Sequence, residues 1–468
     1  CHFSKITETI SMKLLLTLFF PTLLLAQEPF PGLTFHEAPR PLSEKASASD
    51  WPRFFGPRDN CTSNEGPLLK DLSKLKPVFE LVRGDSYASP IISDGKLLHF
   101  HAVDSRETLD CLDPETGRRF WTFSYPIKYR DRYGFSAGPR SSPVVRDKRV
   151  YLIGVTAMLH CLDLESGKIL WKRNLMTEFD IPQYFFGYGP NPVLFQDKLI
   201  INIGGKPKDA LGVCAAAFDI NTGSTAWTLK DEWGASYASP IVTKLHDRPV
   251  VAMMAAGESR PTVGGLMIID PNTGKLHSKF PWRAKVYESV LASTPLALPG
   301  NRIFISECYE KGGVLLQFDK KLQPKPLWVE RWFGMHMMVP LLLDGTLYGF
   351  AGRNPPDTQL KSIDLKSGKL LWENDMIWKE GNLNVGLFRG SFIRCQNRTF
   401  TLGEDGIFAE IQLNPKEAKI LSTKRLFTAR EAWTPPVIHR GLLYITQNSK
   451  GMGGSKKRLI CYDFRALE

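Results

Sequence analysis

The sequence lacks the patterns that mark many enzymes and metal-binding proteins. Its eight cysteines include no adjacent pair, no C-x-x-C and no Cys/His cluster with the spacing of zinc ligands. HExxH and phosphate-binding loops are absent as well. These absences argue against the common zinc-enzyme and P-loop classes, and the sequence predicts no catalytic residue and no metal site.

Charge of one sign is not concentrated anywhere. The chain has 60 basic and 48 acidic residues, a formal charge of +12, but no block of five or more like charges. The longest basic run, at 456–458, is too short for a nucleic-acid-binding arm. The surplus predicts a solvated basic surface, with a basic patch for an anionic partner as the alternative. We expect no nucleic-acid partner.

A long hydrophobic run is also missing. The apolar stretch 14–26 has 13 residues, is interrupted by Pro21 and is too short to span a bilayer. It follows a Met-Lys pair and ends in a Leu-x-Ala cleavage pattern, which is typical of a signal peptide. We expect residues 1–26 to be an over-extended start plus signal peptide, and the mature protein to be periplasmic or secreted. Because no cysteine closely follows this stretch, we expect no lipid anchor.

Helical periodicity is absent, and a repeat takes its place. The hexapeptide "SYASPI" occurs at 86–91 and 236–241, and weaker relatives recur along the chain. Aligned on one position, the copies lie 44 to 55 residues apart, which indicates a repeat architecture. The aligned residues are Pro90, Pro143, Pro192, Pro240, Pro295, Pro340, Phe392 and Pro436.

A second signal recurs in phase with the first: an Asp, a Gly four residues later and a Trp after four more. The Asp can accept N–H groups within its own tight turn, and the Gly can take a positive φ. The Trp, on an outer strand, can lie flat across the neighbouring sheet. We expect a structural docking role for Asp113, Gly117, Trp121, Asp163, Gly167, Trp171, Asp219, Gly223, Trp227, Asp364, Gly368 and Trp372.

Each repeat contains four short apolar segments separated by turns, which predicts a four-stranded antiparallel blade. Eight repeats predict an all-β, eight-bladed β-propeller, or seven blades if the weak unit 391–421 is an insertion. The last repeat stops before its fourth strand, and the segment 76–82 can supply that strand and close the ring. We expect 27–75 to be an N-terminal extension and 76–468 to be the propeller.

These motifs resemble the pyrroloquinoline-quinone-like (PQQ-like) β-propeller repeat proteins. The segment "DWPRFFGPRDN" at 50–60 is similar to the N-terminal segment of exported bacterial members. The family includes quinoprotein alcohol dehydrogenases and the non-catalytic propeller of the outer-membrane assembly machinery. For a dehydrogenase, the resemblance implies an adjacent Cys-Cys disulfide, a Trp floor and a Glu/Asn/Asp calcium site. This chain departs from that pattern, because no two of its cysteines are adjacent.

The loops that enter the innermost strands of a propeller crowd one mouth of its axial channel. Here these loops are rich in aromatic residues, Gly and Arg, which predicts a ligand-binding surface. The alternative for each aromatic residue is packing between blades. The candidate ligand-binding residues are Arg140, Tyr188, Trp233, Trp332, Arg389, Arg430 and Trp433.

Two clusters could attract a metal, but methionine beside an inner strand usually belongs to the core, and a histidine pair on one strand does not make a site by itself. The His and Met residues of 334–338 could bind copper, and His99 and His101 alternate on one strand face. We expect no bound cofactor; the alternative is PQQ with calcium.

Together, these features predict an exported, non-catalytic PQQ-like β-propeller that acts as a protein-interaction or ligand-binding scaffold. We expect a monomer that takes a protein, a small molecule or a glycan at its axial mouth. The alternative is a quinoprotein-type, PQQ-dependent oxidoreductase with a divergent site.

Overall fold

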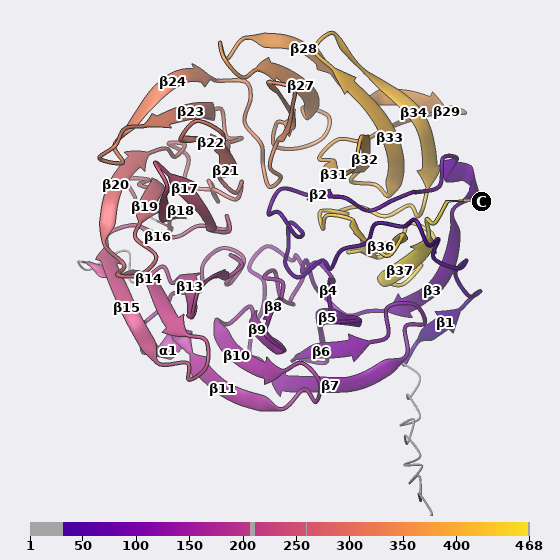
Figure 1. Ribbon diagram of the computed structural model, residues 1–468, viewed down its shortest axis with the longest axis horizontal. Helices are drawn as coiled ribbons and strands as arrows, with labels where there is room; N and C mark the ends of the chain where they lie inside the picture. Colours follow the sequence, from indigo (N-terminus) through magenta and orange to yellow (C-terminus); the bar gives the residue numbers. More distant parts are fainter. Residues whose placement is uncertain (1–30, 206–210, 259, 467–468) are drawn as a thin grey trace, which may run out of the picture.

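The structure is a computed structural model that describes residues 31–466 apart from 206–210 and 259, so the signal peptide expected within residues 1–26 lies outside the described residues. Eight antiparallel sheets, each with four main strands, stand around a central axis (Figure 1). The predicted eight-bladed β-propeller is therefore confirmed. In blades 1 to 7 the chain runs from the axis to the rim within each sheet.

Each blade has four main strands, which are given below in their order from the axis to the rim. The innermost strands are β4 (Ile91–Ser93), β8 (Val144–Arg146), β12 (Val193–Phe195), β17 (Ile241–Leu245), β21 (Leu296–Leu298), β25 (Leu341–Leu343), β31 (Ser391–Cys395) and β35 (Val437–His439). The second strands are β5 (Lys96–Val103), β9 (Arg149–Ile153), β13 (Lys198–Asn202), β18 (Arg248–Ala256), β22 (Arg302–Glu307), β26 (Thr346–Ala351), β32 (Arg398–Leu402) and β36 (Leu442–Gln447).

The outer half of each blade is built in the same way. The third strands are β6 (Arg106–Leu112), β10 (Met158–Asp163), β14 (Gly212–Asp219), β19 (Gly265–Ile269), β23 (Gly312–Phe318), β27 (Gln359–Asp364), β33 (Ile407–Asn414) and β37 (Arg458–Asp463). The outermost strands are β7 (Arg119–Pro126), β11 (Ile169–Asn174), β15 (Thr225–Asp231), β20 (Leu276–Pro281), β24 (Pro324–Glu330), β28 (Leu370–Asn374), β34 (Glu417–Arg425) and β3 (Lys76–Val82).

The remaining elements are short. β1 (Leu33–Phe35) pairs with β3, β2 (Thr62–Ser63) runs parallel to β31, and β16 (Gly234–Ala235) pairs with β18. β29 (Ile377–Glu380) and β30 (Leu383–Gly386) form a separate hairpin, and the helices are η1 (Leu72–Lys74) and α1 (Leu175–Glu178). In the part of the chain that the structure describes, no helix has the length and apolar character needed to cross a membrane.

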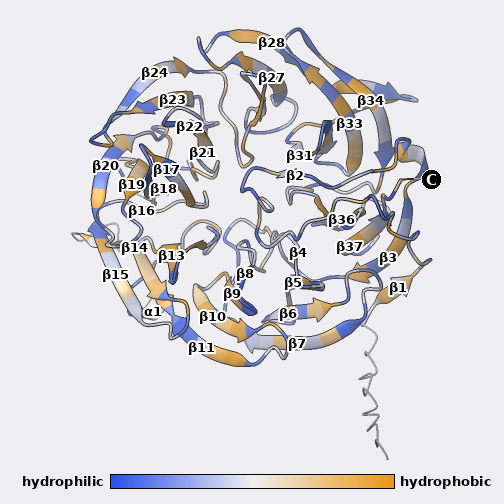
Figure 2. Ribbon diagram, in the orientation of Figure 1, coloured by the Kyte–Doolittle hydropathy of each residue, from blue (hydrophilic) through white to orange (hydrophobic). Residues whose placement is uncertain are grey.

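Burial explains the strand pattern. Seven innermost strands begin directly after the aligned proline, where a missing N–H costs no ladder bond. Second strands such as β26 and β36 are buried along their whole length, because neighbouring blades cover both faces. Along the outermost strands, hydrophobic and hydrophilic stretches alternate (Figure 2). Because the blades cover one another, each sheet buries its faces without needing a second layer.

Indole rings join neighbouring blades near the rim. The Trp121 ring of blade 1 lies against Gly167 of blade 2, and its Nε1–H donates to the Leu164 carbonyl at 3.0 Å. Gly167 has a φ of +69°, and a Cβ there would lie 2.5 Å from the ring, so glycine alone permits this approach. The same hydrogen bond to the next blade, at 3.0 to 3.1 Å, is made by Trp171, Trp227 and Trp372.

The aspartates of the repeated motif hold the turns against which these rings pack. Each accepts a backbone N–H of its own turn through Oδ1, at 2.7 to 2.8 Å. The four residues are Asp113, Asp163, Asp219 and Asp364. Gly117, Gly223 and Gly368 follow in these turns with positive φ, and each faces an aromatic ring of the preceding blade.

The rim also contains contacts that the motif spacing does not predict. Trp328 follows Asp319 by one residue more than the motif allows, yet its ring lies on Gly368 and its Nε1–H donates to a backbone carbonyl of blade 6 at 2.9 Å. Blade 4 has Ser278 at the Trp position, and its hydroxyl donates to the Leu322 carbonyl of blade 5 at 2.6 Å. A hydrogen bond to the next blade is therefore present even where the Asp-Gly-Trp motif is incomplete.

The N-terminal strand β3 closes the ring. It pairs antiparallel with β37, from Lys76 opposite Asp463 to Val82 opposite Arg458. Its Phe79 stands where other blades have the rim tryptophan and lies against Gly117 of blade 1. The predicted closing strand is confirmed, and because β31–β34 form a complete blade, the seven-bladed alternative is excluded.

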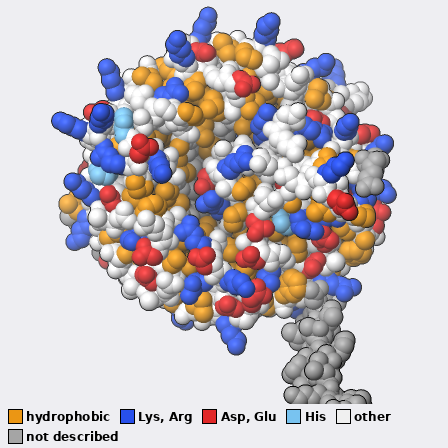
Figure 3. Space-filling model, viewed as in Figure 1, with side chains coloured by type: hydrophobic (Ala, Val, Ile, Leu, Met, Phe, Trp, Pro, Cys, Tyr) orange, Lys and Arg blue, Asp and Glu red, His pale blue; other side chains and the backbone are white. Residues whose placement is uncertain are grey.

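Charged side chains of both signs are spread over the face of the wheel in Figure 3. Lys and Arg project around its edge, Asp and Glu are interspersed among them, and apolar side chains lie between. On this face, the surplus of basic residues has the mixed pattern of a solvated surface.

Candidate functional site

A cavity lies on the axis, where the loops enter the innermost strands. Its volume is about 370 Å³, and each of the eight loops contributes at least one lining residue. Pockets of roughly 300 to 1,000 Å³ enclose small ligands in many proteins. We call this cavity the axial cup; its lining is mostly aromatic and apolar, with three arginines, Arg140, Arg353 and Arg389.

Part of the cup comes from the N-terminal extension. Trp51 pairs with Ile92 of β4, and the Pro52 carbonyl accepts the Val145 N–H of β8 at 3.2 Å. The chain then passes Phe54 and Phe55, whose rings line the cup with centroids 4.6 Å apart, before it reaches β2 beside β31. This segment is therefore built into the channel by backbone pairing and does not lie loosely over it.

A series of aromatic rings lines one side of the cup. Tyr87 stacks on Trp433 at a centroid distance of 5.3 Å, and Phe135 lies 6.0 Å from Trp433. Phe186 continues the series, 5.5 Å from Phe135 and 5.7 Å from Tyr237. Because these rings come from loops of different blades, an apolar surface crosses the blade boundaries.

Two of the arginines are paired with carboxylates inside the protein. Arg140 Nη2 lies 2.8 Å from Asp131 Oδ2, and these side chains are only 9% and 2% exposed. Arg389 Nε donates to Glu404 Oε2 at 2.9 Å, and the Trp433 Nε1–H donates to the other oxygen of that carboxylate at 3.1 Å. These pairs fix the arginines and neutralise their charge within the cup wall.

His336 lies between two of the arginines. Its Nδ1 faces Arg389 Nη1 at 3.4 Å, so this nitrogen accepts and the ring is neutral. Burial and, to a smaller extent, the positive charges of Arg389 and Arg353 together lower the pKa of His336 to about 3. A histidine with so low a pKa is a poor general base at neutral pH.

The structure brings three of the seven candidate ligand-binding residues to the cup: Arg140, Arg389 and Trp433. Tyr188 and Trp233 are buried between blades instead: the Tyr188 hydroxyl donates to a backbone carbonyl at 3.0 Å, and Trp233 lies beneath the Lys279 ammonium. Trp332 and Arg430 are exposed and do not line the cup. An aromatic residue before an inner strand can fill the gap between blades as readily as it can face the axis.

Several cup residues lie outside that set. Tyr87 and Tyr237 come from the two "SYASPI" copies, so the repeated hexapeptide itself was the available signal. Phe54 and Phe55 come from the segment 50–60. Arg353 lies on the loop between β26 and β27, for which the sequence offers no signal.

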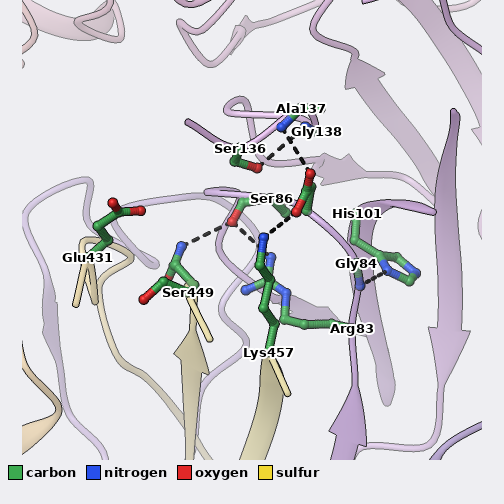
Figure 4. Close-up of polar contacts among 12 residues, drawn as sticks. Arg83, Gly84, Ser86, His101, Ser136, Ala137, Gly138, Glu431, Ser449 and Lys457 are labelled. Carbon is green, nitrogen blue, oxygen red and sulfur yellow. Dashed lines mark hydrogen bonds and ion pairs between the residues drawn. The ribbon is translucent and has the colours of Figure 1, made fainter. Parts of the chain in front are cut away.

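A polar cluster lies next to the cup, where blade 8 meets blade 1 (Figure 4). Lys457 forms an ion pair with Asp85, whose second carboxylate oxygen accepts the Ala137 N–H at 3.1 Å. Arg83 is buried; its Nη2 donates to the Ser86 carbonyl at 3.2 Å, and burial lowers its pKa to about 10. These contacts fasten the closing blade to the first blade.

The two histidines of β5 are placed for packing. The Nδ1 atom of His101 accepts the Gly84 N–H at 3.0 Å, and its Nε2 atom faces the Asp110 carboxylate at 2.9 Å. Its ring stacks on His99 at 4.6 Å. With both of its nitrogens engaged, His101 offers no free lone pair to a metal.

The residues of the cup do not fit the calcium and quinone site of the dehydrogenases. Glu288 is the one carboxylate among the described lining residues. In the described part of the chain, no three His, Cys, Asp or Glu side chains gather where they could hold a metal ion. The disulfide of adjacent cysteines cannot form, because no two cysteines are adjacent. No step through a quinone follows from this arrangement.

Comparison with known proteins places the chain among propellers of two kinds. A family model described as outer membrane protein assembly factor BamB matches residues 105–374. Quinoprotein ethanol dehydrogenase from Pseudomonas putida is 25% identical over 170 residues, which are 34% of this chain and 26% of the dehydrogenase. The match thus spans about a quarter of that enzyme's length.

Solved structures share the architecture. BamB from Moraxella catarrhalis superposes with a TM-score of 0.54 at 14% identity and covers 84% of this chain and 99% of its own. Quinohemoprotein alcohol dehydrogenase from Comamonas testosteroni superposes with a TM-score of 0.62 at 14% identity, covering 91% of this chain and 82% of its own. At such identities the likeness shows the fold alone.

Proposed function

Because the chain belongs to the family of PQQ-like propellers described as outer membrane protein assembly factor BamB, we propose that it is a non-catalytic scaffold that binds a ligand or partner in its axial cup. The observation that carries this proposal is the cup itself, which encloses about 370 Å³ within aromatic side chains. Such surfaces bury a large apolar area at small entropic cost.

The chemistry of the lining favours binding over catalysis. Glu404 and Asp131 are tied up in ion pairs, and His336 is a poor base at neutral pH. A general acid and base need groups that can exchange protons near the working pH. The described cup offers no such pair.

The scaffold is proposed to act outside the cytoplasm, in the periplasm or as a secreted protein, as a monomer without a lipid anchor. The apolar stretch 14–26 and the family support this location. Fractionation of the producing cells, with and without residues 1–26, tests it: retention in the cytoplasm of the full-length protein would contradict it.

A direct test combines an activity assay with a binding assay. Purified protein is incubated with PQQ and calcium and assayed for dye-linked alcohol oxidation, with a quinoprotein alcohol dehydrogenase as positive control. We expect no turnover, and robust turnover would overturn the proposal. Fluorescence titration with the neutral aromatic probe 2-naphthamide should show saturable binding that Trp433→Ala weakens.

The second candidate function is a PQQ-dependent oxidoreductase with a divergent site, favoured by the similarity to quinoprotein ethanol dehydrogenase. A retained quinone would add a near-UV absorbance band to protein purified from a PQQ-producing host. A band that is lost on extraction and restored by added PQQ would favour this candidate over the scaffold. A glycan panel tests the further possibility that a sugar occupies the cup.

A further inference from the structure

We propose that the ligand of the axial cup has an aromatic body and a carboxylate, and that Arg353 receives the carboxylate. This inference rests on the proposed binding function and narrows it to one class of ligand.

Arg353 differs from the other two arginines of the cup. Arg140 and Arg389 each face a buried carboxylate, Asp131 or Glu404. Arg353 is exposed, and no Asp or Glu of the described residues lies within ion-pair distance of it. It is therefore the arginine of the cup whose charge is available to a ligand.

Arg353 is also held in place. Its guanidinium carbon lies 4.7 Å from the centre of the Tyr309 ring, and Tyr309 in turn packs edge-on against His336 at 5.8 Å. A guanidinium stacked on a ring keeps its N–H groups at its edge, where they match the two oxygens of a carboxylate. The stacking therefore orients the group without consuming its hydrogen-bond donors.

The surrounding wall carries an excess of positive charge. Arg389 and Arg353 flank His336, which remains neutral, and Glu404 balances only one of them. Asn354, next along the chain, also lines the cup and faces Arg389 Nη1 at 3.4 Å. The remaining charged lining residue is Glu288, which is exposed to solvent and is therefore more strongly screened.

The apolar surface is contiguous with this wall. The Arg389 guanidinium lies 4.7 Å from the centre of the Trp433 ring, and Tyr87 and Phe135 pack on that same ring. A flat aromatic body against these rings would place a substituent toward the arginines. An aromatic carboxylate satisfies both surfaces at once.

Isothermal titration with three matched probes tests the inference: 2-naphthoate, neutral 2-naphthamide and cationic 2-naphthylmethylammonium. Since a hydrogen bond to a charged group is worth a factor of about ten or more, we expect 2-naphthoate to bind at least about tenfold more tightly than 2-naphthamide. Arg353→Gln should bring that ratio close to one, mainly by weakening the binding of 2-naphthoate. Arg331→Gln, an exposed arginine stacked on Trp332 outside the cup, is the matched control and should preserve the ratio.

The outcomes separate this inference from the proposed function. If 2-naphthamide or the cation binds as tightly as 2-naphthoate, the carboxylate preference is wrong although the cup is a binding site. If Arg353→Gln keeps the full preference, the role of Arg353 is wrong. If no probe binds at millimolar concentration, the proposed function itself fails. Glu288→Gln should leave the order of the three probes unchanged, and a reversed order would contradict the inference.

The carboxylate could belong to a small molecule or to the C-terminus of a polypeptide. A tripeptide that ends in phenylalanine, titrated beside 2-naphthoate, distinguishes these sources. Its C-terminal amide is the control for the contribution of the carboxylate. Tighter binding of the free acid than of 2-naphthoate assigns the cup to a chain end, and weaker binding assigns it to a small molecule.

Discussion

At the rim, Trp121, Trp171 and Trp227 make the same contact with the next blade, whereas in the cup each loop contributes a different side chain. The rim contact joins a ring, a glycine and a carbonyl at a fixed spacing. The cup residues share only their position before an innermost strand. Closure of a ring requires the same interface many times, while a binding site requires one arrangement once.

This comparison predicts that a substitution at the rim lowers the free energy of unfolding. Trp121→Ala should lower the free energy of unfolding by about 3 to 5 kcal/mol, because it removes the ring from Gly167 and the bond to the Leu164 carbonyl. Urea unfolding followed by circular dichroism measures this. Trp332→Ala is the control; its ring is 58% exposed, so its cost should stay below about 0.5 kcal/mol. Equal losses in the two variants would contradict the account of the rim.

Acid should destabilise the protein partly through the cup. Between the ordinary histidine pKa of about 6.5 and the pKa of about 3 for His336, the unfolded chain binds a proton that the folded protein does not. The free energy of unfolding therefore falls as the pH falls through this window. His336→Gln removes this term, so the loss between pH 7.5 and 4.5 should shrink by roughly 2.5 to 3 kcal/mol.

A blade histidine separates the two causes of this effect. Burial lowers the pKa of His160 to about 4, with a smaller contribution from Lys172 and none from the cup arginines. Arg353→Gln should therefore raise the pKa of His336 in an NMR titration and leave that of His160 unchanged. A change at both histidines would show that the variant disturbs the fold.

Two glycines with the same φ isolate the effect of the ring contact on stability. Gly167 and Gly95 both have a φ of +69°, but a Cβ at Gly95 would meet no atom within 4 Å. Both alanine variants carry the strain of a positive φ, and Gly167→Ala adds a clash with Trp121. We expect Gly167→Ala to cost about 1 to 3 kcal/mol more than Gly95→Ala in urea unfolding. A difference near zero would mean that the ring is free to move.

The smallest effect is expected at a candidate that lies outside the cup. Arg430→Gln should change the affinity for 2-naphthoate by less than about twofold, because a screened charge on the surface contributes little. Arg353→Gln serves as the comparison in the same titration. A loss at Arg430 as large as that at Arg353 would extend the site beyond the cup.

The sequence reveals the rim because the rim repeats. Spacing alone identifies the Asp, Gly and Trp positions, and the shortened last repeat identifies 76–82 as the closing strand. Trp328 escapes because one inserted residue shifts it out of register, although the fold restores its contact with Gly368. The packing at the rim therefore tolerates an inserted residue, whereas a search for a fixed motif spacing misses the tryptophan that follows it.

The residues of the cup are only partly predictable from the sequence, because their side chains do not repeat from blade to blade. All the mouth loops could be located from the repeat, but the direction of each side chain depends on contacts between blades. Tyr188 turns into the core and Tyr237 turns toward the axis, although both precede an innermost strand. Arg353 comes from a different kind of loop altogether, so its place in the cup depends on how blades 5 and 6 pack.

The most direct test of the separation between rim and cup is the dissociation constant of 2-naphthamide for Trp433→Ala and Trp121→Ala, measured under conditions in which both variants are folded. The account predicts that Trp433→Ala weakens binding by about tenfold or more, because it removes a central ring of the cup. It predicts that Trp121→Ala stays within about twofold of the unmodified protein. Unchanged binding in Trp433→Ala, or an equal loss in both variants, would contradict it.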